Sequence, residues 1–233
     1  MFCYWAKKCG GFPSRKGNLM QIRFQGVPAL ATALLGLLII LPACATTGRD
    51  RATKTTASIT AVESDYKEAS NQIDATNSSL LELIQPIQQN VKKAYSDYAA
   101  NVNKTEKLAT QLHRHTEQMT LRRDAYFTEW EGEYTSPAIR ELGERRRMEL
   151  KAVYAQIPEA SIGLRGDLAS YVTDIREIEM YLSNDLTPQG IQAIRPIAQR
   201  AVKDGESVKE GIHRVLLAIG RVQTEMGQGG MKQ

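Results

Sequence analysis

The sequence predicts an all-α fold in which about four helices form an elongated, antiparallel, spectrin-like bundle with coiled-coil seams. Apolar residues recur every three or four positions through most of residues 52–226, which is the spacing of one helix face. No run of alternating apolar and polar residues indicates a strand in that segment. Ser136-Pro137 and Thr187-Pro188 combine a capping residue with a proline suited to a first helical turn.

The first predicted helix ends near Gln85, because a proline at position 86 disfavours the helical conformation in the residue before it. A second helix starts in the region of Pro86 or Gln88 and stops at Gly132. The seam of the first helix alternates steps of three and four residues: Ile59, Val62, Tyr66, Ala69, Ile73, Thr76, Leu80, Leu83 and Ile87. Its charged residues, Asp65 among them, fall outside this seam.

A third helix is predicted from Pro137 to Leu182, and a fourth from Pro188 to Met226. Pro158, Gly163 and Gly166 interrupt the third, but its seam keeps its phase, so we expect a kink and no domain boundary. The two middle helices are each about 45 residues, or roughly 70 Å. Joined by a short turn, they predict a long central hairpin that the shorter outer helices cover in part.

Residues 1–43 are typical of a signal peptide. The 15 uncharged residues from Val27 to Leu41 are too few to cross a bilayer comfortably, since a spanning helix needs about 20. Met20 could begin a complete signal by itself, so residues 1–19 are expected to be an overcalled start. A longer leader remains the alternative.

Leu41-Pro42-Ala43-Cys44 resembles the lipobox of bacterial lipoproteins, although Pro42 is unusual at its position. The resemblance implies cleavage between Ala43 and Cys44 and attachment of diacylglycerol, with palmitate among the acyl chains, to the Cys44 sulfur. Ala45 then favours the periplasmic face of the outer membrane. The alternative is an ordinary signal peptide followed by an incidental cysteine. We predict a lipidated tether over 44–51, one helical domain over 52–226 and a disordered tail over 227–233.

The net charge of +4 belongs to the leader, which holds five basic residues and no acidic one. The remaining chain carries 25 basic and 26 acidic residues and offers no concentrated cationic face. Nucleic acid is therefore not an expected partner.

Aromatic residues gather near the turn between the two middle helices, at Tyr126, Phe127, Trp130 and Tyr134. We expect Trp130 to pack against the start of the third helix near Ile139 or Leu142, with an exposed docking surface as the alternative. Glu129 and Glu131 flank Trp130, but residues two apart on a helix point to different faces. They are therefore expected to be solvated.

Five arginines, Arg122, Arg123, Arg145, Arg146 and Arg147, form a candidate docking patch for anions if the hairpin brings position 122 opposite position 146. The alternative is a solvated face balanced by Glu141, Glu144 and Glu149. His113 and His115 lack the i, i+4 spacing of helical metal pairs, so no metal is expected. No catalytic motif or cofactor loop is recognised, and we expect no enzyme activity.

The segment Tyr126–Glu131 is similar to the LFxEWE signature of an uncharacterised family of helical bacterial lipoproteins, the domain of unknown function 2959. The segment Tyr181–Ile191 resembles that family's FLKHNLNAxAI segment, and Tyr95 and Tyr154 fall where the family places tyrosines. Ser183 and Asn184 replace an expected basic pair, Ser170 replaces an expected proline, and Pro158 is an addition. The resemblance implies fold and anchoring, and it implies no activity.

The expected function is that of a membrane-anchored periplasmic lipoprotein whose helical rod is a structural or protein-interaction module of the cell envelope. The lipid holds it to a membrane and its partner is an envelope protein, while its oligomeric state stays open. A holdase-like chaperone and an accessory subunit of an envelope transport or secretion machine are the alternatives.

Overall fold

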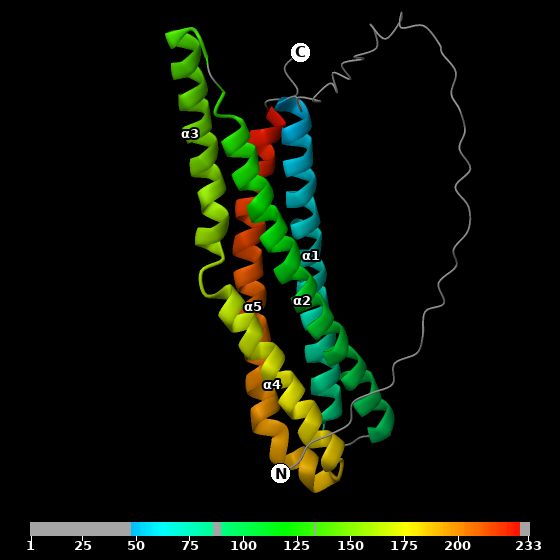
Figure 1. The fold of residues 1–233 in the computed structure, drawn as a ribbon. Coiled ribbons are helices and arrows are strands. Elements are labelled where there is room, and N and C mark those ends of the chain that lie inside the picture. Colours follow the sequence, from blue (N-terminus) through cyan, green and yellow to red (C-terminus); the bar gives the residue numbers. More distant parts are fainter. Residues whose placement is uncertain (1–47, 86–89, 133, 229–233) are drawn as a thin grey trace, which may run out of the picture. The chain divides into compact units, whose positions relative to one another are not determined.

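The computed structural model describes residues 48–85, 90–132 and 134–228 (Figure 1). The chain divides into two units, residues 1–43 and 44–233, and the first lies wholly outside the described residues. The regular structure of the described residues is entirely helical, which confirms the predicted all-α bundle. Its five helices are α1 (Gly48–Leu83), α2 (Val91–Glu129), α3 (Pro137–Ala160), α4 (Leu164–Asn184) and α5 (Pro188–Gln228).

The helices form four roughly parallel columns, because α4 continues in the direction of α3 (Figure 1). The most extensive contact is between α1 and α2, while α5 packs against α1, α3 and α4. Helix α2 contacts the column formed by α3 and α4 mainly through α4. The two middle helices thus run antiparallel as expected, yet α2 packs mainly on α1 and α3 packs mainly on α5.

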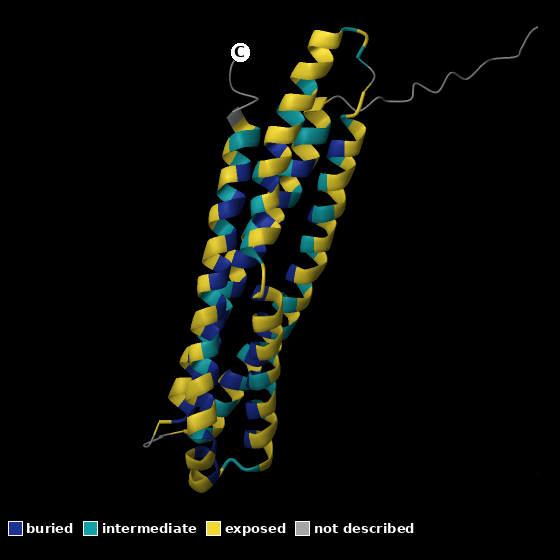
Figure 2. Ribbon diagram, turned by 90° about the vertical axis from the view of Figure 1, so that its left-hand side faces the viewer, coloured by how far each residue is buried: buried dark blue, intermediate teal, exposed yellow. Residues whose placement is uncertain are grey.

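The predicted seams of the first and last helices form the core. Every seam residue of α1 from Ile59 to Leu83 is buried, whereas Ile87 lies outside the described residues. Buried residues follow the inward faces of the helices (Figure 2). The predicted seam of the last helix is buried at Ile191, Ile194, Ala198, Ala201, Gly205, Val208, Ile212, Val215, Ile219 and Val222.

The predicted third helix is broken, not kinked. A three-residue turn, 161–163, separates α3 from α4, and Gly163 adopts a left-handed φ of 82° that ends the helical path. Pro158 lies one turn earlier, inside α3, where it removes a backbone donor. Both α3 and α4 nevertheless pack on α5.

The helix ends differ in detail from the predicted ones. Asn90 caps α2 by accepting a 3.0 Å hydrogen bond from the Lys93 backbone N–H, and residues 86–89 lie outside the described residues. Thr187 caps α5 through a 3.1 Å bond from the Gly190 N–H, whereas Ser136 makes no side-chain cap bond at the start of α3. Helix α1 begins within the predicted tether, and α5 runs to Gln228, two residues past the predicted end of the domain.

Candidate interaction site at the proximal end of the bundle

One end of the bundle collects the start of α1, the end of α2, the start of α3 and the end of α5 (Figure 1). We call it the proximal end, because it is the end of the bundle nearest to Cys44 along the chain: α1 begins at Gly48, four residues after Cys44. The first turns of α3 extend beyond the ends of the other three helices (Figure 1). The turn between α2 and α3 and its aromatic residues therefore belong to this end.

The aromatic residues at the proximal end make a chain of edge-to-face contacts. The Tyr126 ring centroid lies 5.3 Å from that of Phe127 and 5.6 Å from that of Trp130, and Phe127 lies 5.5 Å from Tyr154 of α3. Phe127 is buried, while Tyr126 and Trp130 are half-buried. Burial raises the pKa of the Tyr126 and Tyr154 phenols. Of these aromatic residues, Phe127 and Tyr154 link α2 to α3.

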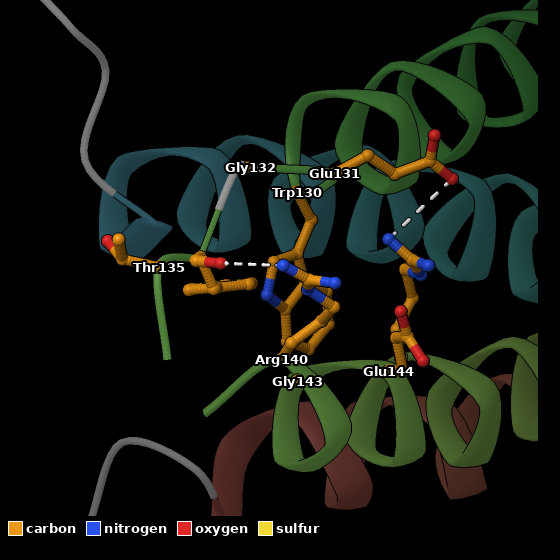
Figure 3. A pocket seen from close by; sticks show the side chains of 9 residues that line it. Trp130, Glu131, Gly132, Thr135, Arg140, Gly143 and Glu144 are labelled. Carbon is orange, nitrogen blue, oxygen red and sulfur yellow. Dashed lines mark hydrogen bonds and ion pairs between the residues drawn. The ribbon is translucent and has the colours of Figure 1, made fainter. Parts of the chain in front are cut away.

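Trp130 lies beside the first turns of α3. The indole contacts Tyr126 and lines an open cavity of about 670 Å³ together with Arg140 and Gly143 (Figure 3). Ile139 and Leu142, named as its packing partners from the sequence, are 54% and 56% exposed. Because α3 begins further out than α2 ends, the first seam positions of α3 have no helix opposite them (Figure 1).

Polar groups frame the same cavity. Arg140 donates from Nη2 to the Tyr134 carbonyl oxygen at 3.1 Å, and Arg147 forms an ion pair with Glu131 at 3.6 Å (Figure 3). A Cβ on Gly143 would lie 3.2 Å from Tyr134 Cε2, so a glycine allows the tyrosine ring to approach α3 closely. The cavity thus has aromatic walls and a rim that carries both signs of charge.

The five candidate arginines do not form one patch. Arg147 of α3 forms an ion pair with Glu131, and Arg123 of α2 lines a cavity with Tyr154 and Pro158 of α3. Position 122 of α2 therefore lies opposite a part of α3 well after position 146. Arg123 pairs with Asp124 at 2.7 Å, and Arg146 pairs with Glu225 of α5 and, at 3.6 Å, with Glu149. Arg122 and Arg145 are exposed, as are Glu141 and Glu144. The predicted juxtaposition across the hairpin is therefore wrong.

The paired glutamates and histidines point to different partners. Glu129 faces Arg51 of α1 at 3.8 Å, whereas Glu131 faces α3. His113 is exposed and lies 3.1 Å from Glu117. His115 Nδ1 lies 2.5 Å from Asp65 Oδ2. Within the described ranges, no cluster of His, Cys, Asp or Glu side chains could hold a metal ion.

Asp65 is the main polar residue that sequence reasoning missed, since it was placed outside the seam. It is only 5% exposed, and Gln111 Nε2 donates to its other carboxylate oxygen at 2.7 Å. Helix α1 contacts both α2 and α5, so its buried face is wider than a single seam. Gln111 and His115, one turn apart on α2, were the available signal for a buried polar partner.

An apolar groove of about 1040 Å³ runs between α2 and α4, next to the turn that separates α3 from α4. Leu112, Leu164 and Leu168 form its floor together with Tyr66 of α1. Its rim is polar and includes His113, Glu117 and Arg165. The groove depends on the spacing between two helix columns, which residue periodicity does not encode.

No family model, curated protein or solved structure matches the chain. The resemblance to the uncharacterised lipoprotein family therefore stays a prediction. Among the described helices, none is long and apolar enough to cross a membrane.

Proposed function

We propose that the chain is an envelope lipoprotein, held by acyl chains on Cys44 at the periplasmic face of the outer membrane. The observation that carries this proposal is the tetrad Leu41-Pro42-Ala43-Cys44 directly after an uncharged stretch of signal-peptide length. These residues lie outside the described part of the chain. Each buried methylene contributes about 0.8 kcal/mol, so two or three acyl chains hold a protein durably where one chain does not.

Metabolic labelling with palmitate tests the anchor. The wild-type chain should incorporate label and Cys44→Ser should not, because the thioether forms on that sulfur. Thr46→Ser is the matched control, since it changes a neighbouring residue but keeps the Cys44 sulfur, and it should leave labelling unchanged. Equal labelling of the wild type and Cys44→Ser would refute the anchor.

The helical domain serves as a binding module, and its partner is an amphipathic helix of another envelope protein. The groove between α2 and α4 supports this role, because apolar floors with polar rims receive helices that present an apolar face. Its α2 wall extends from Glu106 to Leu121, about 22 Å, which matches four turns of a docked helix. A binding role fits this open groove better than catalysis, which usually needs a concave, pre-organised pocket.

A photocrosslinking amino acid tests the groove in intact cells. Ala169 lines the groove and is exposed, and Ala100 is exposed on α2 outside it. Benzoylphenylalanine at Ala169 should capture a helical peptide of a single envelope protein, and the same residue at Ala100 should not. Identical adducts from both positions, or none from either, would contradict a docking groove.

A holdase-like chaperone is the second candidate, and one observation favours it. Ile139, Leu142 and Met148 of α3 are more than half exposed, which could offer apolar surface to unfolded chains. Suppression of client aggregation that is lost in Ile139→Ser/Leu142→Ser would support this candidate over the groove.

A further inference from the structure

The length of the tether limits how far the bundle can stand from a membrane. Cys44 precedes Gly48, the first residue of α1, by four positions. Four residues span at most about 14 Å in any conformation. If Cys44 carries acyl chains, as the proposed function requires, the proximal end must lie next to the bilayer. The opposite end of α1 lies about 54 Å along the helix from Gly48.

The proximal end presents apolar side chains that no part of the described bundle covers. Ile139 and Leu142 continue the seam that is buried at Leu150 and Tyr154, but they lie in the first turns of α3 and are exposed. The first turns of α3 are mostly exposed, at one extremity of the bundle (Figure 2). This surface is therefore at the position that the tether brings to the membrane.

The surrounding residues match the chemistry of a bilayer surface. Trp130 and Tyr134 lie at the same end, and these two residue types are enriched where hydrocarbon meets headgroups. Arg145 is exposed one turn after Leu142, on the same face of α3, where a long cationic side chain can reach phosphates. Glu144 falls on the opposite face by helical spacing, while Glu141, one turn before Arg145, borders the arginine.

We propose that residues 137–142 of α3, with Trp130 and Tyr134, form a second membrane contact that rests on the phospholipid surface beside the lipid anchor. Ile139 and Leu142 enter the boundary between headgroups and acyl chains, as the apolar face of an interfacial helix does. This contact rests on the proposed lipidation, and it fixes the orientation of the bundle with its α4 end pointing away from the membrane.

Fluorescence quenching in vesicles tests the contact on the full lipidated protein. Cys44 is the only cysteine after the predicted cleavage site and its sulfur is consumed by lipid, so an introduced cysteine is the only free thiol. Leu142→Cys carries an environment-sensitive dye, and Ile139→Cys is a second reporter. Ile162→Cys is the matched control, because Ile162 is 77% exposed at the turn between α3 and α4. The vesicles contain phosphatidylethanolamine and phosphatidylglycerol, some with nitroxide-labelled acyl chains.

The expected result is that dyes at positions 142 and 139 lose most of their emission to the nitroxide, while the dye at 162 keeps it. Equal emission at all three positions, in protein that floats with the vesicles, would overturn the contact and leave the anchor standing. Protection of position 142 only when envelope proteins are added would assign this surface to a protein and also overturn it. Wild-type protein that fails to float would refute the anchor, and the contact with it.

Discussion

Helix α4 and the first half of α3 carry the same three- and four-residue spacing but have opposite environments. Tyr171, Ile175, Ile178 and Leu182 of α4 are at most 1% exposed, between α2 and α5. Ile139 and Leu142 of α3 are more than half exposed. Periodicity selects the face of a helix, whereas burial also requires a neighbour at the same height. The α4 half of the bundle therefore stabilises the fold, whereas the start of α3 leaves apolar side chains free for an external contact.

Buried polar groups strengthen the contrast. Tyr98 donates to the Ile175 carbonyl oxygen at 2.7 Å, and Tyr171 donates to Asn77 Oδ1 at 2.9 Å. Both tyrosines are fully buried, and each joins two helices through a directed bond. At the proximal end, by contrast, the first half of α3 is joined to α5 and to the end of α2 by partly exposed ion pairs, which contribute little each.

The two halves should differ most in the free energy of unfolding that is lost when one apolar or aromatic side chain is truncated in each. Tyr98→Ala should lower the free energy of unfolding by about 3–5 kcal/mol, since it leaves a cavity in a packed core. Leu142→Ala should change it by less than about 0.5 kcal/mol. Urea denaturation followed by circular dichroism measures both. Similar losses from the two variants would show that the division into halves is wrong.

Alkaline pH should weaken the buried half. Burial raises the pKa of Tyr98 and Tyr171 above the ordinary value of 10.0 in the folded chain. Their phenols then stay neutral when folded but ionise when unfolded, so stability is intact below pH 10 and falls as pH rises above it. Each tyrosine should cost about 1.4 kcal/mol per pH unit. Tyr98→Phe should show a smaller decline in melting temperature between pH 9 and 11 than the wild type, and an unchanged decline would contradict this account.

Alanine substitution of two glycines in α5 should change the stability of the bundle in opposite directions. A Cβ on Gly205 would lie 2.8 Å from Asn77 Nδ2 and 2.9 Å from Tyr171 Cε2, whereas one on Gly220 would meet nothing within 4 Å. Gly205→Ala should therefore destabilise the bundle by about 1–3 kcal/mol through overpacking. Gly220→Ala should stabilise it by up to about 1 kcal/mol through helix propensity. Thermal unfolding of the two variants gives the signs directly, and the same sign for both would be inconsistent with the packing around Gly205.

Trp130→Ala should act only locally. The indole is half-buried at the end of the bundle, where a segment can open without global unfolding. Limited proteolysis should show faster cleavage near Gly132 and nearly unchanged helicity. An unchanged cleavage pattern would mean that Trp130 does not hold the turn and would favour an exposed docking role.

Most of the fold could be predicted because α1 and α5 have strict seams and because prolines mark the starts of α3 and α5. The chain breaks where a kink was predicted, because Gly163 adopts a left-handed φ. An apolar seam that keeps its phase across the glycine does not exclude such a break. The arginine patch was wrong because it assumed that α3 begins at the height where α2 ends. The offset between these two helices depends on how α3 packs against α5.

Hydrogen exchange of the amides in α3 and α4 tests the central claim most directly. The lipidated protein in phospholipid vesicles is compared with a chain that begins at Ala45 and carries no lipid. The hydrogen-bonded amides of residues 140–142 should exchange faster than those of residues 171–182 in the lipid-free chain, and they should exchange markedly more slowly in vesicles, while the exchange rates of α4 stay unchanged. Exchange of residues 140–142 at the rate of α4 without lipid, or no slowing in vesicles, would contradict a bundle that is stable at its α4 end and membrane-bound at its proximal end.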